Sequence, residues 1–155
     1  MNAPPIRFGR NLSSAGDIRL HLTECAPAFV PSLDSRVVIQ DYAAKLALHA
    51  ERFEAWHGAH LVGLVALYDG TSAGGEAFVS NVSVAPGFTR RGLARRLLAD
   101  AIGHARGGCP AIALQVDRRA PALALYLSLG FTVAARDGDG LTLRLALAPQ
   151  AHAHR

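Results

Sequence analysis

Four arginines surround one glycine where a loop becomes a helix, and this feature constrains the fold more than any other stretch. Residues 87–98 read GFTRRGLARRLL. The arginines around Gly92 are Arg90, Arg91, Arg95 and Arg96. Free N–H groups already concentrate positive charge at the start of a helix, so acidic side chains are normally favoured there. The fold must therefore place something at this turn that offsets two sources of positive charge.

An anion with several oxygens meets that requirement. Because Gly92 has no side chain, another group can approach the backbone closely at this point. The free N–H groups of the first helical turn would then bind the anion, as helix starts bind phosphate in other proteins. We interpret the stretch as a phosphate site. The alternative is that some of the arginines simply extend from the apolar face of the helix into water.

Charge and motifs narrow the class of ligand. The chain has no G-x-x-x-x-G-K-[ST] motif, which excludes a Walker-type loop, and it lacks the G-x-G-x-x-G of a dinucleotide fold. The net charge of +4 comes from fifteen arginines and one lysine and is locally concentrated. Stacking aromatics are not interleaved with these basic residues. A small anionic ligand therefore fits better than a nucleic acid.

Hydrophobic periodicity predicts the elements before the arginine turn. Ile18, Leu20 and Leu22 alternate with polar residues, which indicates a half-buried strand over 17–24. Between residues 27 and 50, apolar residues recur at three- and four-residue steps, which predicts two short helices. A hairpin over 51–69 turns at residues 57–59, where His-Gly-Ala joins two apolar runs.

The second half of the chain alternates more regularly between strands and helices. A strand is expected over 76–86, because proline usually stands at a strand end. The arginine-rich helix covers 89–106, and a continuous apolar run predicts a doubly buried strand over 110–117. A helix over 120–130 has proline in its first turn and glycine at its end. Two strands, 131–137 and 141–148, close the chain around a turn.

This order predicts a single α/β domain. The expected sheet is mixed and mostly antiparallel, with six to seven strands, and is flanked by about four helices. A chain of 155 residues, half of them apolar, can bury one substantial core. We expect an N-terminal arm over 1–16, the domain over 17–148 and a tail over 149–155.

Cysteine usage and hydropathy bear on compartment. Cys25 and Cys109 lie far apart without CxxC or His-flanked spacing, so two buried thiols are expected in preference to a disulfide or a metal site. No apolar run approaches the roughly 18 residues of a membrane span, and the start of the chain has no signal-like apolar region. We expect a cytoplasmic protein with no metal and no membrane partner.

Two segments together resemble a known family. VSVAPGFTRRGLARRLL, followed by ALQVDRRAPALALYLSLGFTV, is similar to the GCN5-related N-acetyltransferases, the GNAT superfamily. That pattern consists of a V-x-V strand end, a turn of the form [Q/R]-x-x-G-x-[G/A], and a later A-x-x-L-Y-x-x-x-G-F. The resemblance covers residues 76–135, and the order of the other elements also fits. It implies the acyl-CoA acyltransferase fold.

The resemblance also implies a donor and its contacts. Acetyl-CoA would be the co-substrate, and backbone N–H groups of the turn would hold its pyrophosphate. Those groups belong to Arg90, Arg91, Gly92, Leu93, Ala94 and Arg95. Pantetheine would pair like an added strand along Val82, Ser83 and Val84. Thr89 stands where the family has Gln or Arg, and Arg119 stands where it often has an Asn that contacts pantetheine.

Acetyl transfer to an amine needs a base for the amine and an acid for the departing thiolate. The resemblance places Tyr126 near the thioester sulfur, although a purely structural tyrosine in the core is the alternative. The resemblance implies that a carboxylate on the fourth strand often acts as the base, and Glu76 is the carboxylate closest to that position. A solvated strand-end glutamate is an equally good interpretation. Glu54, His57 and His60 are further candidates for the base, and a water chain needs none of them.

The acceptor is less constrained than the donor. The loops around residues 25–40 and 70–76 would recognise it, and they carry no substrate motif. A small-molecule amine is the first expectation, and a protein N-terminus or lysine is the second. A regulatory module that binds acetyl-CoA without catalysis remains a rival function. A homodimer is left open.

Overall fold

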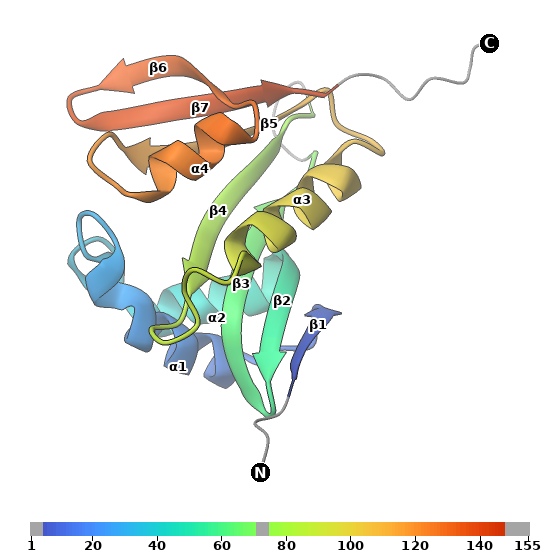
Figure 1. Cartoon of the computed structure of the whole chain (residues 1–155), viewed down its shortest axis with the longest axis vertical. Coiled ribbons are helices and arrows are strands. Elements are labelled where there is room, and N and C mark those ends of the chain that lie inside the picture. Colours follow the sequence, from blue (N-terminus) through green and yellow to red (C-terminus); the bar gives the residue numbers. More distant parts are fainter. Residues whose placement is uncertain (1–4, 71–74, 148–155) are drawn as a thin grey trace.

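Seven strands form one sheet in the order β1-β2-β3-β4-β5-β7-β6 (Figure 1). The computed structural model describes residues 5–70 and 75–147. The strands are β1 (Ile6–Arg10), β2 (Glu51–His57), β3 (His60–Tyr68), β4 (Ala77–Val84), β5 (Ala111–Asp117), β6 (Thr132–Asp137) and β7 (Gly140–Ala146). All neighbouring pairs are antiparallel except β4 with β5, which is parallel.

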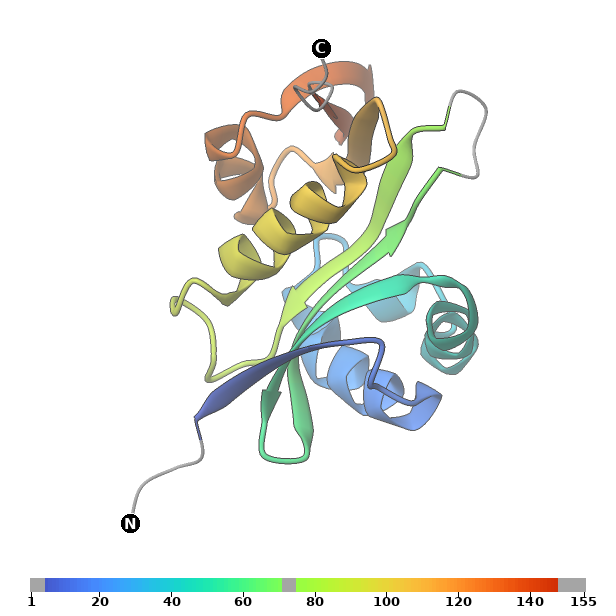
Figure 2. The ribbon, with the colours of Figure 1, turned by 90° about the vertical axis from the view of Figure 1, so that its right-hand side faces the viewer.

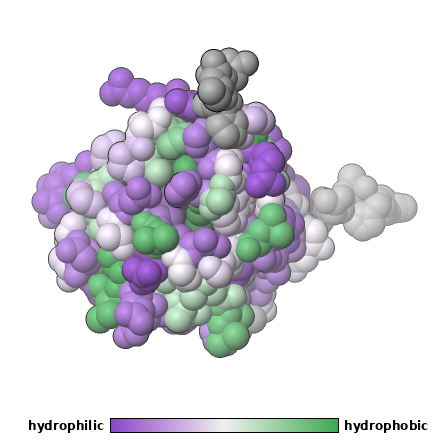
Figure 3. Space-filling model, turned by 90° about the horizontal axis from the view of Figure 1, so that it is seen from below, coloured by the Kyte–Doolittle hydropathy of each residue, from purple (hydrophilic) through white to green (hydrophobic). Residues whose placement is uncertain are grey.

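Helices cover both faces of the sheet (Figure 2). They are α1 (Ala15–Cys25), α2 (Ile39–His49), α3 (Leu93–Ala105) and α4 (Ala122–Ser128), with single 3₁₀ turns η1 (Ala26–Ala28) and η2 (Leu33–Ser35). One buried cluster joins α3 and α4 to the sheet, and a second joins α1 and α2 to the opposite face. Seen from below, the surface is mainly hydrophilic, with hydrophobic residues in separate groups (Figure 3).

The predicted fold class is confirmed, as are most of the elements after residue 50. The hairpin turns at Gly58 and Ala59, with His57 paired to His60. The strand predicted from residue 76, the arginine-rich helix and the central strand from residue 110 appear as β4, α3 and β5. A β-bulge between Ala55 and Trp56 interrupts the alternation on the first arm of the hairpin.

The strand predicted over residues 17–24 is wrong, because these residues belong to helix α1. A capping box between Ser14 and Asp17 fixes the start of this helix. The buried side chains, Ile18, His21, Leu22 and Cys25, are spaced as one helical face. Leu20, which completed the apparent alternation, is 58% exposed. The alternation was therefore a coincidence within a helical pattern.

Two other expectations for the first third of the chain need correction. The loose arm expected before residue 17 contains an edge strand, β1, which pairs with β2. The first of the two helices expected between residues 27 and 50 is replaced by η1 and η2, while the second is α2. Pro27 and Pro31 lack the N–H groups that a continuous helix over this segment would need.

A buried carboxylate ties the β1–α1 connection to the sheet. Glu54 on β2 is 0% exposed and accepts the N–H groups of Leu12 at 2.9 Å and Ser13 at 3.1 Å. It also accepts the Ser13 hydroxyl and the indole N–H of Trp56. The buried guanidinium of Arg52 lies 3.5 Å away. Glu54, one of the candidate bases, is thus fully engaged in holding the start of α1.

We expect Glu54→Gln to lower the free energy of unfolding by about 3–5 kcal/mol, because it leaves Arg52 buried without its counter-charge and turns an amide donor toward backbone N–H groups. Urea denaturation measures the change. Glu51→Gln is the matched control. Glu51 is on the same strand as Glu54, and its substitution breaks a half-exposed ion pair with Arg10 of β1, which should lower the free energy of unfolding by about 1 kcal/mol or less. Equal losses in the two variants would contradict the structural role assigned to Glu54.

Candidate active site

The parallel strands β4 and β5 pair over only three residues before they separate. Ala77, Phe78 and Val79 are paired with Ile112, Ala113 and Leu114. Beyond this point both strands line a pocket of about 360 Å³. The other edge of β4 remains paired with β3 as far as Val84. The edge of β4 that faces the pocket therefore keeps backbone groups available for an extended ligand.

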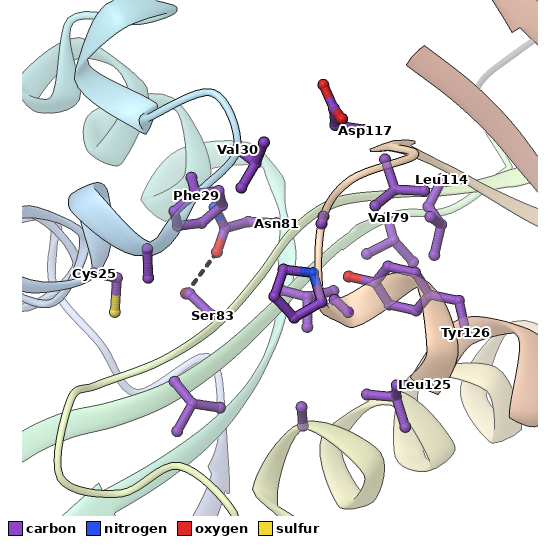
Figure 4. A pocket seen from close by; sticks show the side chains of 18 of the residues that line it. Cys25, Phe29, Val30, Val79, Asn81, Ser83, Leu114, Asp117, Leu125 and Tyr126 are labelled. Atoms are coloured by element: carbon purple, nitrogen blue, oxygen red, sulfur yellow. Dashed lines mark hydrogen bonds between the residues drawn. The ribbon is translucent and has the colours of Figure 1, made fainter. Parts of the chain in front are cut away.

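The pocket has walls from both faces of the sheet (Figure 4). Ala94 of α3 and Leu125 and Tyr126 of α4 lie on one side. Cys25 of α1 and Phe29, next to η1, lie on the other. Two ligands could therefore approach each other from opposite faces, through the gap between β4 and β5.

The loop from β4 to α3 forms a backbone cradle at one edge of this pocket. Arg90 and Gly92 both have left-handed backbone conformations, with φ of 65° and 77°. The first helical hydrogen bond runs from Arg96 N–H to the Gly92 carbonyl at 3.0 Å, so the N–H groups of Leu93, Ala94 and Arg95 have no partner within the helix. No side chain of the described residues caps this start. A Cβ on Gly92 would meet nothing within 4 Å, so the space beside it is open.

Two of the four arginines contact other side chains of the protein through hydrogen bonds, and two are exposed on the turn. Arg96 pairs with Asp100 at 3.1 Å and lies over the ring of Phe8, and Arg95 donates to Ser128 at 2.9 Å. Arg90 and Arg91 are exposed on the turn itself. The alternative interpretation, that arginines extend along the helix surface, therefore describes Arg96. The other three remain at the turn or face α4.

Strand β4 presents its predicted ligand-binding residues on alternate sides. Val82 and Val84 pack toward the α3 cluster, whereas Ser83 is 6% exposed and faces α1. All three residues line the pocket, and so do Thr89 and Ala94 from the following turn. The structure thus brings together the V-x-V strand end and the arginine turn.

Tyr126 projects its hydroxyl into the pocket (Figure 4). The residue is 6% exposed, and its ring packs edge-on against Phe131 with the centroids 6.2 Å apart. Burial raises the pKa of Tyr126 to about 12, because the charged phenolate is poorly solvated there. The phenol therefore keeps its proton at neutral pH and can donate it.

Comparison with known proteins agrees with this architecture. The sequence pattern of the Acetyltransferase (GNAT) family matches residues 17–131. The chain belongs to this family. No curated protein sequence matches the chain.

Solved structures of GNAT proteins share its fold. A GNAT-family protein from Desulfovibrio desulfuricans has a TM-score of 0.76 at 21% identity, over 93% of this chain and 100% of the other. The ribosomal-protein-S18-alanine N-acetyltransferase of Escherichia coli has 0.74 at 19%, over 97% and 99%. The yncA protein of Salmonella typhimurium, solved with its cofactor acetyl-CoA, has 0.70 at 22%, over 98% of both chains.

Two predicted site residues of this GNAT domain, Glu76 and Arg119, belong neither to the pocket lining nor to the arginine turn. Glu76 comes just before β4, at the end opposite Val84, and pairs with Arg144 at 3.1 Å. Arg119 donates to Asp117 at 2.8 Å and lies 3.6 Å from Asp139. The hydrogen bonds from Arg119 hold the pKa of the Asp117 carboxyl well below its usual range. Arg119 thus positions a carboxylate that does line the pocket.

The sequence pattern did not single out a buried polar network behind Ser83. His21 is 1% exposed; its Nδ1 lies 3.0 Å from the Leu61 carbonyl and its Nε2 lies 2.8 Å from the Ser83 hydroxyl. Ser83 Oγ lies 2.7 Å from the Asn81 side chain. Burial lowers the pKa of His21 to about 4. Helical periodicity over 15–25 would have placed His21 on a buried face.

Cys25 lies beside the same imidazole, with Sγ 3.7 Å from Nε2. Burial raises the pKa of its thiol to about 12, so Cys25 is neutral and weakly nucleophilic at pH 7. In the described parts of the chain, no three His, Cys, Asp or Glu side chains gather closely enough to hold a metal ion. Nor does any described helix have the length and hydropathy needed to cross a membrane.

We expect the buried His21 to make the fold acid-sensitive. The unfolded chain binds a proton near pH 6.5, whereas folded His21 does so only near pH 4. Unfolding therefore takes up a proton in this window, and the free energy of unfolding should fall by up to about 1.4 kcal/mol per pH unit as the pH drops from 6.5. Urea titrations at pH 7, 6 and 5 measure this slope.

His21→Gln should flatten the slope, while replacing the exposed His60 by Gln should leave it as in the wild type. An unchanged slope in His21→Gln would show that another group takes up the proton.

Proposed function

We propose that this GNAT domain transfers an acetyl group from acetyl-CoA to a primary amine of a small molecule, by direct attack of the amine on the thioester. The observation that carries the proposal is the pocket between β4 and β5, which is walled from both faces of the sheet. It lies next to the N–H groups at the start of α3 that have no partner within the helix, and it contains the Tyr126 hydroxyl. A donor and an acceptor can therefore meet within it.

The donor would be held mainly by backbone groups. N–H groups from Arg90 to Arg95 would bind the pyrophosphate, helped by the helix dipole and the exposed arginines. The free edge of β4 at Val82 and Val84 would hydrogen-bond the pantetheine amides as a neighbouring strand would. In this position the thioester would lie beside the pocket wall formed by Tyr126. The yncA structure, which was solved with its cofactor acetyl-CoA, supports acetyl-CoA as the donor.

The reaction needs one bond formed and one broken. The neutral amine attacks the thioester carbonyl carbon, the C–N bond forms, and the C–S bond breaks with its electron pair passing to sulfur. Tyr126 would donate its proton to that sulfur. The nitrogen would lose one proton to solvent as the amide forms, and the phenolate would regain one from solvent, so the protons balance. Because burial raises the pKa of the phenol to about 12, the protonated form that can act as the donor is present throughout the neutral pH range.

Thiol release from acetyl-CoA tests the proposal directly. The full chain is incubated with acetyl-CoA and a panel that includes small primary amines, a peptide N-terminus and a peptide lysine. Amine-dependent thiol release with a small amine is the expected result. Thiol release only with the peptides would show that the acceptor is a protein amine and not a small molecule. Binding of acetyl-CoA without release for any amine would favour the non-catalytic regulatory module.

We expect acetyl-CoA to raise the melting temperature. At one hundred times the dissociation constant, mass action supplies about 2.7 kcal/mol. Gly92→Val should abolish this shift, because its side chain would occupy the open space over the first-turn N–H groups. Differential scanning fluorimetry with and without millimolar acetyl-CoA measures the effect.

Gly75→Val is the matched control for Gly92→Val, because Gly75 has nearly the same φ, 72° against 77°, and an added Cβ would meet no described residue within 4 Å. Both variants carry the same backbone strain, but Gly75 precedes β4 at the end away from the arginine turn. Gly75→Val should keep the full ligand-induced shift. Normal binding by Gly92→Val would show that the anion does not lie at the α3 start.

We expect Tyr126→Phe to lower kcat on the order of 10²-fold at neutral pH, the usual scale for losing a general acid. The ring and its contact with Phe131 remain, so stability and acetyl-CoA binding should persist. The loss should appear in kcat more than in KM, because the hydrogen bond strengthens as charge grows on sulfur. Steady-state kinetics, together with a melting curve, measures both.

Tyr68→Phe provides the control, since it removes a buried hydroxyl that has no hydrogen-bond partner among the described residues and does not line the pocket. It should retain wild-type kcat. A well-folded Tyr126→Phe with unchanged kcat would leave solvent as the proton donor for CoA.

A further inference from the structure

A chain of hydrogen bonds connects the pocket to a buried imidazole. It runs from Asn81 to the Ser83 hydroxyl and on to His21 Nε2, over distances of 2.7 and 2.8 Å. The other imidazole nitrogen, Nδ1, lies 3.0 Å from the Leu61 carbonyl. Ser83 and Asn81 line the pocket, whereas His21 lies behind them on α1. An imidazole within reach of a hydroxyl, and oriented by a third group, is the arrangement that makes a hydroxyl able to move a proton.

The direction of each hydrogen bond follows from counting protons. A carbonyl only accepts, so Nδ1 of His21 must carry a proton and donate it to Leu61. Burial keeps the imidazole neutral, with a pKa of about 4, and Nε2 is therefore a free lone pair. The Ser83 hydroxyl must donate to it. Ser83 has no second proton, so Asn81 must present an N–H to Ser83 Oγ.

In Figure 4 the amide oxygen of Asn81 faces Ser83, so the proton count requires the amide group to be rotated by half a turn, with its nitrogen facing Ser83 instead. In that drawn orientation the Asn81 Nδ2 atom is buried without a hydrogen-bond partner among the described residues. The rotation gives this N–H an acceptor. Both observations therefore agree on one polarised chain, from Asn81 through Ser83 to His21.

Other groups near the pocket are poorly suited to accept a proton. Asp117 is the only carboxylate among the described lining residues, and its two oxygens receive hydrogen bonds from Arg119. Glu76 lies outside the lining and is paired with Arg144. Cys25 is a neutral thiol with no capacity to take up a proton. The Ser83 hydroxyl, backed by the free lone pair of His21, is the remaining protein route.

We propose that Ser83 and His21 form the proton relay that deprotonates the attacking nitrogen of the acceptor. The proposal rests on the acetyl transfer proposed above. As the C–N bond forms, the nitrogen proton passes to Ser83 Oγ while the Ser83 proton passes to His21 Nε2. The C–S electron pair leaves with sulfur. The imidazolium then returns its proton through Ser83 to water, so the relay is unchanged after each turnover.

A weak base is adequate for this step. A nitrogen that has added to the carbonyl carries positive charge and is far more acidic than the free ammonium ion, so proton transfer to a neutral imidazole becomes favourable as the bond forms. A protonated amine in solution would not be deprotonated by this relay. The acceptor must therefore enter the pocket as the free amine. Ser83 acts directly on the substrate, and His21 acts through it as a positioning residue and proton store.

Two variants test the relay. Ser83→Ala removes the hydroxyl, and His21→Gln keeps a hydrogen-bonding side chain but removes the base. In each we expect kcat to fall on the order of 10²-fold, with acetyl-CoA affinity retained. Imidazole added at fixed pH and ionic strength should raise kcat of Ser83→Ala in proportion to its concentration and leave the wild type unaffected. A structural role alone predicts no such rescue.

Tyr68→Phe is the matched control. Tyr68 at the end of β3 has a buried hydroxyl with no hydrogen-bond partner among the described residues. Tyr68 does not line the pocket. If this variant loses as much kcat as Ser83→Ala, or if Ser83→Ala and His21→Gln keep kcat within about twofold of wild type, the relay is overturned. If the His21→Gln variant fails to fold, the kcat of Ser83→Ala and its recovery with added imidazole test the relay.

Failure of the acetyl transfer itself is distinguishable. A wild-type chain that binds acetyl-CoA but releases no thiol with any amine removes both proposals. An active wild type with fully active relay variants removes only the relay.

Discussion

The three-residue parallel contact between β4 and β5 is the constraint from which the rest of the site follows. Ala77–Val79 and Ile112–Leu114 hold the two halves of the sheet together. If the pairing were longer, no pocket would open between the strands. If it were absent, the β1–β4 half and the β5–β7 half would lose their continuous hydrogen-bonded connection. The short pairing therefore gives both a rigid sheet and an opening within it.

Strand β4 serves both halves of this arrangement because its two edges and two faces have different neighbours. One edge is bonded to β3, and the other faces the pocket beyond Val79. A bulge opposite Ala66 and Leu67 changes the side-chain alternation, so Val79 packs toward α3 while Asn81 and Ser83 face α1. Without that irregularity, the residues on the α1 side of the strand would differ.

Sequence patterns anticipated the residues on the α3 and α4 side of the pocket far better than those on the α1 side. The arginine turn, the V-x-V strand end and Tyr126 lie within one stretch whose local patterns are strong, and all contribute to the same pocket. The residues around His21 were misjudged because Ile18, Leu20 and Leu22 alternate by chance within a helix. The hydrogen-bond partners of His21 are Leu61 and Ser83, which are 40 and 62 residues away in the chain. No local period encodes such pairings, nor the ion pair that joins Glu76 to Arg144.

The proposed site separates charged groups from the place where bonds would change. Cationic side chains, and N–H groups without a partner in the helix, lie at the rim of the pocket around the start of α3. There water can solvate them and an anion can bind to them. Inside, burial acts on three groups in the direction that keeps each of them neutral: it raises the pKa of Tyr126 and Cys25 and lowers that of His21. A neutral interior stabilises neutral amine and thioester over their charged forms, and it strengthens any hydrogen bond made to charge that develops during transfer. In the proposed reaction, the Tyr126 phenol and the His21 imidazole would thus begin each cycle uncharged, which would let them act in opposite directions at the same pH.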